Sequence, residues 1–186
     1  MTDVQRVPIL TLEPLIEAVR EGVESTGWEL SGLQKTTSHQ FEGRWEGDSS
    51  RSAYLFFHPA DGPDSVSVDV FLDETSKGIT GNLALVVDME ALGGLGDVGE
   101  VLGVLGKLST GFLPSGYRTP VTLRFRLDDG ARDPAEAESE VRFKLRFPKA
   151  ALEAGASAIA ALTSATVRAF EALMGSPDLA RYLDGS

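Results

Sequence analysis

Apolar and polar residues alternate along residues 65–73, SVSVDVFLD, and this two-residue period restricts the fold more than any other feature of the chain. Successive side chains of an extended strand point to opposite faces, so alternate apolar residues share one face of a sheet. The apolar residues in phase here are Val66, Val68, Val70 and Leu72. The pattern predicts a β-strand with one buried face.

Strand-like patterns surround this stretch and return near the end of the chain. Residues 28–88 hold several short apolar runs separated by turn sequences such as PADGPD, which predicts an antiparallel meander. Residues 119–147 hold two more alternating runs, TPVTLRFRLDD and SEVRFKLRFP, joined by a polar link, which predicts a hairpin. We therefore expect a mainly antiparallel sheet of about seven strands.

Helical periodicity occupies most of the remaining sequence. Apolar residues at spacings of three and four predict a helix over residues 11–26, with Thr11 as its N-cap and Gly27 as its stop. Three further helices are predicted: a central glycine-rich helix over 93–108, a long C-terminal helix over 149–174 and a short terminal helix over 177–183. The chain, residues 1–186, is thus expected to form a single α+β domain.

Composition narrows the classes of function. The chain has no cysteine, which excludes disulfides, thiolate zinc sites and cysteine nucleophiles. Its formal net charge of −11 opposes binding to nucleic-acid phosphates and to anionic lipid, because such binding needs clustered Lys and Arg. The first residues lack the basic start and apolar core of a secretory signal, and no apolar run approaches the roughly 20 residues of a membrane span. We expect a cytoplasmic protein with no nucleic acid, membrane or cofactor among its partners.

The stretch GLGDVGEVLGVLGKL, residues 94–108, contains the pattern G-x-G-x-x-G of dinucleotide-binding turns. That fingerprint requires a strand, a glycine turn and a helix in direct succession, and here DMEAL separates the preceding strand from Gly94. Acidic residues, among them Asp97 and Glu100, also stand where a pyrophosphate would lie. We therefore expect this segment to serve packing and not nucleotide binding.

The glycines of this segment recur at helical spacing and form a face without side chains. They are Gly96, Gly99, Gly103 and Gly106. Such a face lets another backbone approach closely, so Gly103→Leu is expected to disrupt packing. The alternative is a loop-like entry with helix only from about Val98, since element boundaries are hard to predict.

Alanine recurs along the predicted C-terminal helix beside larger apolar residues, which adds a second smooth surface. Two smooth helices, together with a strand AYLFFH that is apolar on both faces, offer more packing surface than one sheet face needs. A homodimer is therefore expected. The alternative is that both helices cover the sheet within one chain.

Basic residues gather on one face of the predicted hairpin 119–147, although the chain is acidic overall. By alternation they point away from the core; they are Arg124, Arg126, Arg142, Lys144 and Arg146. One interpretation is a binding face for a carboxylate, a phosphate or an acidic partner segment. The other is a solvated face whose cations pair across strands with carboxylates such as Asp69 and Asp73.

Catalytic constellations are scarce in the sequence. The two histidines, His39 and His58, lie near the edges of different predicted strands, without a second histidine at metal-ligand spacing. Neither G-x-S-x-G nor S-x-x-K occurs, and Ser115 lacks the preceding glycine of a nucleophile elbow. No metal site, cofactor or catalytic residue is predicted.

The predicted order of elements, helix, meander, helix, hairpin and long helix, loosely resembles that of small acidic secretion chaperones of the type III class. That resemblance, which no motif carries, implies a dimeric role in binding an unfolded partner segment. We expect a non-enzymatic module, chaperone-like or adaptor-like, that binds a protein or peptide partner as a homodimer.

Two alternatives stay open. One is a carrier of a small apolar ligand in a cavity between the sheet and the long C-terminal helix. The expected lining is Phe41, Trp45, Tyr54, Phe56 and Phe71. The other alternative is an enzyme of unidentified type, which would need a cleft that brings His39 or His58 next to a carboxylate.

Overall fold

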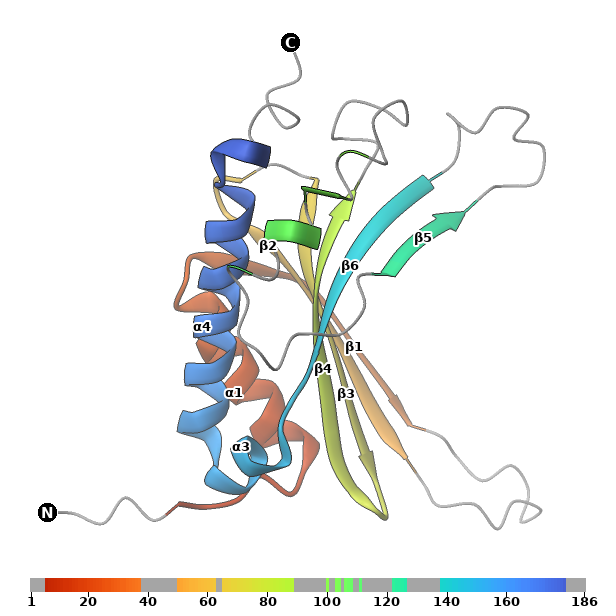
Figure 1. Ribbon diagram of the computed structural model, residues 1–186. Helices are drawn as coiled ribbons and strands as arrows, with labels where there is room; N and C mark the ends of the chain where they lie inside the picture. The colour runs from red at the N-terminus through yellow and green to blue at the C-terminus, as the bar shows by residue number, and fades with distance from the viewer. Residues whose placement is uncertain are drawn as a thin grey trace, which may run out of the picture.

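Two layers build the protein, helices on one side and a twisted sheet on the other (Figure 1). The structure, a computed structural model, describes the following residues: 6–37, 50–62, 65–88, 100, 103–104, 106–108, 111, 122–126 and 138–179. All statements below concern these residues.

The strands form one open antiparallel sheet in the order β1-β2-β3-β4-β6-β5. Their bounds are Trp28–Thr37 for β1, Arg51–Pro59 for β2, Val66–Thr75 for β3, Gly78–Asp88 for β4, Thr122–Arg126 for β5 and Glu138–Arg146 for β6. The late hairpin joins the meander because β6 pairs with β4, with Leu85 opposite Phe143. The α+β class and the antiparallel sheet are confirmed, and the described ranges hold six strands where about seven were expected.

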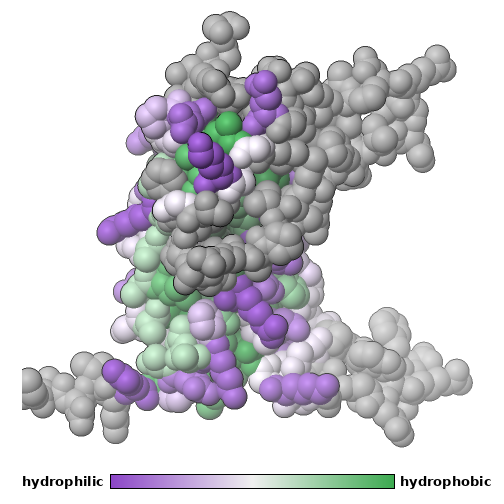
Figure 2. Space-filling model, in the orientation of Figure 1, coloured by the Kyte–Doolittle hydropathy of each residue, from purple (hydrophilic) through white to green (hydrophobic). Residues whose placement is uncertain are grey.

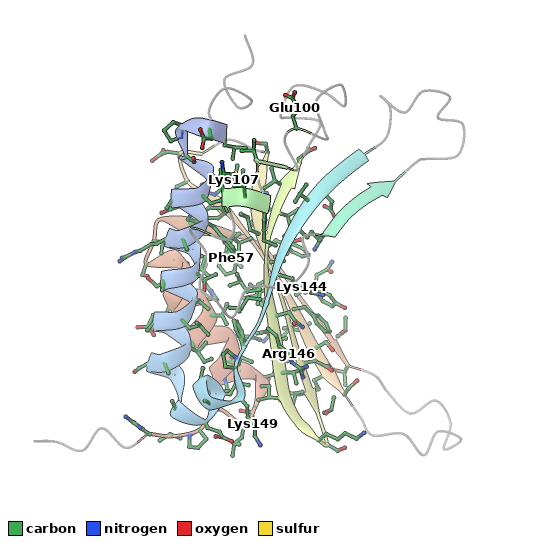
Figure 3. The ribbon with its side chains drawn as sticks, viewed as in Figure 1. Phe57, Glu100, Lys107, Lys144, Arg146 and Lys149 are labelled. Carbon is green, nitrogen blue, oxygen red and sulfur yellow. The ribbon has the colours of Figure 1, made fainter. Side chains whose placement is uncertain are left out.

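Burial along the strands follows the alternation of the sequence. In β3 each of the four in-phase apolar residues is buried while the residues between them are partly exposed. In β2 the buried residues are Ala53, Leu55 and Phe57, so the phenylalanine at 57 faces the core and its neighbour Phe56 does not. The core therefore lies between this face of the sheet and the helices, and Figure 3 shows Phe57 in that layer.

Helix α1, Leu12–Glu24, packs against α4, Ala156–Met174, and both lie over the same face of the sheet (Figure 1). The two helices lie close together at Gly22, where an added Cβ would overlap with Thr163 Oγ1 and with the Ala160 carbonyl oxygen. Part of the small-residue surface of the C-terminal helix thus contacts α1 of the same chain. The start of β1 is tied to this pair, since Trp28 Nε1 donates a hydrogen bond of 2.8 Å to Glu171.

The single helix expected over 149–174 is wrong, because the chain breaks at Gly155 into α3, Lys149–Ala154, and α4. Gly155 has a φ of 104°, which favours glycine, and the Val7 carbonyl oxygen would lie 2.6 Å from an added Cβ. The segment before α1 therefore crosses the chain at this break. Its backbone is fixed there by a hydrogen bond of 2.9 Å from Ile9 N–H to the Leu152 carbonyl.

Helix α1 begins directly after Thr11, the expected N-cap residue, but its capping hydrogen bond comes from a residue distant in the sequence. The Thr11 side chain makes no capping hydrogen bond, and Glu74 Oε2 at the end of β3 accepts one from Leu12 N–H at 2.7 Å. Arg51 joins this carboxylate, at 2.9 Å, to that of Glu13, which it contacts through both terminal nitrogens. A carboxylate at a helix N-terminus also interacts favourably with the helix dipole.

This ion network predicts a dependence of stability on pH. Hydrogen bonds from Arg51 lower the pKa of Glu13 to about 2. Because the pKa is lower in the folded state than in the unfolded chain, the stabilisation is fully present above the unfolded value and is lost as the pH falls towards 2. The difference in free energy of unfolding between the native chain and Glu13→Gln, measured by urea unfolding across this range, should therefore shrink with falling pH. A difference that stays constant would contradict this role of Glu13.

Two predicted helices lie largely outside the described residues. Of the helix expected over 93–108, the described residues 100, 103–104 and 106–108 are helical. Of the helix expected over 177–183, residues 177–179 are helical, and Leu179 is buried in the core. Among the described helices, none has the length and apolar character needed to cross a membrane.

Candidate functional site

The sheet face opposite α1 and α4 is not covered by any helix of the described ranges, and we call it the open face. Its central residues are Tyr54, Phe56, Asp69, Phe71, Asn82, Ala84, Arg142, Lys144 and Arg146. Figure 3 shows Lys144 and Arg146 on the side of the sheet away from the helices. These residues bring aromatic and charged side chains together on one surface.

Strand register arranges these residues in rows that cross the sheet. One row runs from Tyr54 through Phe71 and Asn82 to Arg146. The next runs from Phe56 through Asp69 and Ala84 to Lys144. Each row therefore begins with an aromatic residue on β2 and ends with a cation on β6.

A shallow groove of about 370 Å³ follows the centre of the open face. Its floor is made of small residues of β4, and Ala84 is only 4% exposed because larger neighbours surround it. On one side stand Phe56, Phe71 and Tyr54, of which Tyr54 and Phe71 lie with ring centroids 4.8 Å apart. Tyr54 at the rim is 38% exposed. The groove thus offers aromatic surface to solvent.

A carboxylate cluster surrounds Arg142 at the other side of the groove. Arg142 contacts Asp69 at 3.3 Å and Glu140 at 2.7 Å. Burial raises the pKa of Asp69, and the guanidinium of Arg142 and a hydrogen bond from Ser67 offset part of this effect. Two acidic partners therefore hold Arg142 in place. For this residue, the contacts agree with the second interpretation of the basic face, in which its cations pair with carboxylates across strands.

The other predicted basic residues differ in their surroundings. Lys144 and Arg146 are exposed on the open face, and the described residues provide no ion pair to Arg146. The backbone of Arg124 and Arg126 lies in β5 opposite Glu140 and Glu138, while their side chains fall outside the described part. Three of the five predicted residues are thus brought to one surface.

The aromatic residues assigned to a ligand cavity do not lie beneath the C-terminal helix. Tyr54, Phe56 and Phe71 are on the face opposite α4, because Leu55, Phe57 and Val70 take the core side of the same strands. Phe41 and Trp45 are outside the described residues. The aromatic residues that can be placed therefore belong to the open face.

One histidine meets a serine at the edge of this face. Ser31 Oγ lies 2.8 Å from His58 Nδ1 and donates to the Phe56 carbonyl at 3.0 Å. The donor in the contact between Ser31 and His58 depends on the tautomer of the histidine. A serine nucleophile would instead give its proton to the imidazole. His39 is outside the described residues.

The described glycines of the predicted stripe have space around them. A Cβ added at Gly103 or Gly106 meets no heavy atom of the described residues within 4 Å, while Gly96 and Gly99 lie outside these residues. Contact of this stripe with a partner stays a prediction. On the outer side of α4, Figure 2 shows mildly apolar surface, and exposed alanines lie there at Ala161, Ala165 and Ala172.

Comparisons with protein-family models, curated proteins and solved structures found no match for this chain. The described residues also contain no group of three His, Asp or Glu side chains placed to hold a metal ion.

Proposed function

We propose that the protein is a non-enzymatic module that binds a protein partner through the open face. The observation that carries this proposal is the aromatic groove beside a cationic strand, on a sheet face that no described helix covers. Partly exposed aromatic side chains on a contiguous surface are typical of interaction sites. Chaperone-like or adaptor-like roles and a cytoplasmic location remain expectations within this proposal.

The residue types on the open face support binding of protein in particular. Tyr, Phe and Arg are enriched in the buried centres of protein interfaces, where aromatic rings supply large contact area and Arg supplies directional hydrogen bonds. Tyr54, Phe71 and Arg146 stand in one row and are all accessible. A partner that covers this row would bury two rings and one guanidinium together.

The polar groups near the groove support binding without catalysis. Asp69 forms an ion pair with Arg142, and Ser31 donates a hydrogen bond to the Phe56 carbonyl. Both groups therefore have partners within the chain. The geometry of His58 thus favours a structural role at the end of β2.

Photo-crosslinking tests the proposal. A benzoylphenylalanine placed at Phe71 should form covalent adducts with protein in the cell of origin, because that side chain lines the groove. The same probe at Ala165, exposed on the outer side of α4, is the matched control and should give far fewer adducts. Equal labelling from both positions, or none from position 71, would count against a protein-binding role of the open face.

A second candidate function is carriage of a small ligand in the same groove. Its volume of about 370 Å³ reaches the lower end of the range of small-molecule sites, and its lining combines aromatic rings with Asn82 and Lys144. Native mass spectrometry of the purified protein should then find a bound small molecule that Phe71→Ala removes. A mass equal to that of the bare chain would leave protein binding as the better candidate.

A further inference from the structure

The two halves of the open face differ in shape and charge. The half formed by β2 and β3 carries the bulky rings Tyr54, Phe56 and Phe71 and the carboxylates Asp69 and Asp73. The half formed by β4 and β6 carries small residues, Asn82 and Ala84, followed by the three cations of β6. Bulky aromatic residues thus stand on one side, and small residues and cations stand on the other, where Glu140 also lies beside Arg142.

A surface with these two halves is complementary to itself. A twofold interface places the same patch on both subunits, so each half must fit the other. An axis that runs along the strands between β3 and β4 brings β2 over β6 of a second copy and β3 over β4 of that copy. Two sheets packed face to face keep their strands within about 30° of each other, so rows near the axis stay opposite one another.

We propose that the occupant of the open face is a second copy of this chain, packed sheet on sheet around such an axis. This rests on the proposed function and names its partner. In the row that begins with Tyr54, the ring of Tyr54 then lies over Arg146 of the partner subunit, and Phe71 lies over Asn82 of the partner subunit. In the second of these contacts, the ring of Phe71 fills the groove above β4 of the partner subunit.

Charge supports a second copy as the occupant. The chain carries a net charge of −11, so most approaches of one copy to another are repulsive. In this arrangement Asp69 lies over Ala84 of the partner subunit, while the rings of Tyr54 and Phe56 lie over Arg146 and Lys144 of the partner subunit, so the attraction comes from cations placed over aromatic rings. The tyrosine and arginine pairs add cation–π attraction, which strengthens when the pair is removed from water.

Sedimentation velocity over a wide range of protein concentration tests the dimer. The native chain should be dimeric, and Tyr54→Lys should be monomeric, because it places a lysine over Arg146 of each partner. We expect its dissociation constant to rise about tenfold or more, since like charges across an interface are strongly unfavourable. Ala165→Lys on the outer side of α4 adds the same charge and should leave the dimer intact. Tyr54 is 38% exposed, so the variant should fold, and circular dichroism can check this.

Mixing two variants tests the axis itself. Arg146→Glu should also weaken self-association, since it removes the cation from the partner's ring. When Tyr54→Lys and Arg146→Glu chains are mixed, one side of the mixed dimer gains a lysine–glutamate pair and the other keeps the native pair. Mixed dimers should therefore form more readily than either variant alone. Absence of this recovery would overturn the proposed docking geometry.

The outcomes for the two proposals can be told apart. A native chain that stays monomeric at all concentrations overturns the second-copy inference. If the probe at Phe71 then crosslinks a different protein, the open face still binds a protein and only its partner was wrong. If that probe crosslinks nothing, protein binding by the open face fails as well. Dimers that both charge variants leave unchanged would place the interface elsewhere and also overturn the inference.

Discussion

Gly22→Leu should destabilise the protein by about 3 kcal/mol or more, the upper range of overpacking effects. At this position even one added carbon would overlap with Thr163 Oγ1 and the Ala160 carbonyl oxygen and would lie 3.0 Å from Ala160 Cα. Two of these atoms are backbone atoms of α4, so they cannot move aside without separating the helices. Urea unfolding followed by far-ultraviolet circular dichroism measures the loss.

Gly103→Leu is the matched control, since it makes the same substitution at another helical glycine. A Cβ at Gly103 meets no heavy atom of the described residues within 4 Å, so, contrary to the expectation from the glycine spacing, the free energy of unfolding of this variant should change by about 0.5 kcal/mol or less. Better helix propensity of Leu could raise stability slightly. Should Gly22→Leu fail to fold, Gly22→Ala gives the smaller loss of about 1–2 kcal/mol. A Gly22→Leu protein as stable as the native chain would contradict close packing of α1 on α4.

The position of the close helix contact was not predictable from the glycine pattern. Four glycines at helical spacing suggested a packing surface around Gly103, whereas a single glycine in α1 contacts α4. A lone glycine within an amphipathic helix has no periodicity to reveal it. What determines its role is the crossing of α1 over Ala160, and crossing geometry depends on the whole tertiary arrangement.

The strands and their buried faces were predictable, because the two-residue period indicates both directly. The alternation in β3 and β6 gave the buried faces correctly, and the pairing of Arg142 with Asp69 follows from strands that share one sheet. Strand order was harder, since no local pattern shows that β6 lies beside β4. The break at Gly155 also depends on the distant Val7, so helical periodicity alone could not indicate it.

The alternation in the sequence predicted the aromatic residues of the groove, but it did not predict on which side of the sheet the helices would lie. The sequence predicts that Tyr54 and Phe56 form a second apolar face of β2. Which of the two faces the helices cover depends on the tertiary fold. The larger number of fully apolar positions, among them Leu55 and Phe57, decides it, because the helices bury the more hydrophobic side. The groove therefore lies opposite the cavity that was expected. Ser31 was missed because it lies at a β-bulge between Leu30 and Gly32, where alternation is interrupted.

Phe57→Ala should cost about 3–5 kcal/mol of folding free energy, the usual loss for a fully buried phenylalanine. Phe57 is 0% exposed and lies between the sheet and the helices (Figure 3), whereas the adjacent Phe56 alternates to the open face and is partly exposed. Phe56→Ala removes the same atoms one residue away and should cost about 1 kcal/mol, because solvent already reaches that ring. Equal losses for the two variants would contradict the assignment of the two faces.

The dependence of the melting temperature on protein concentration further distinguishes Phe56 from Phe57. If the open face binds a second copy, association stabilises the folded state, and the melting temperature of the native chain rises with protein concentration. Phe57→Ala should lower the melting temperature at every concentration and keep this rise, since its ring does not reach the interface. Phe56→Ala should lower it little at low concentration and lose the rise, because Phe56 contributes to the self-complementary surface. A rise that survives Phe56→Ala and disappears in Phe57→Ala would reverse the roles of the two faces and would place association on the helical side.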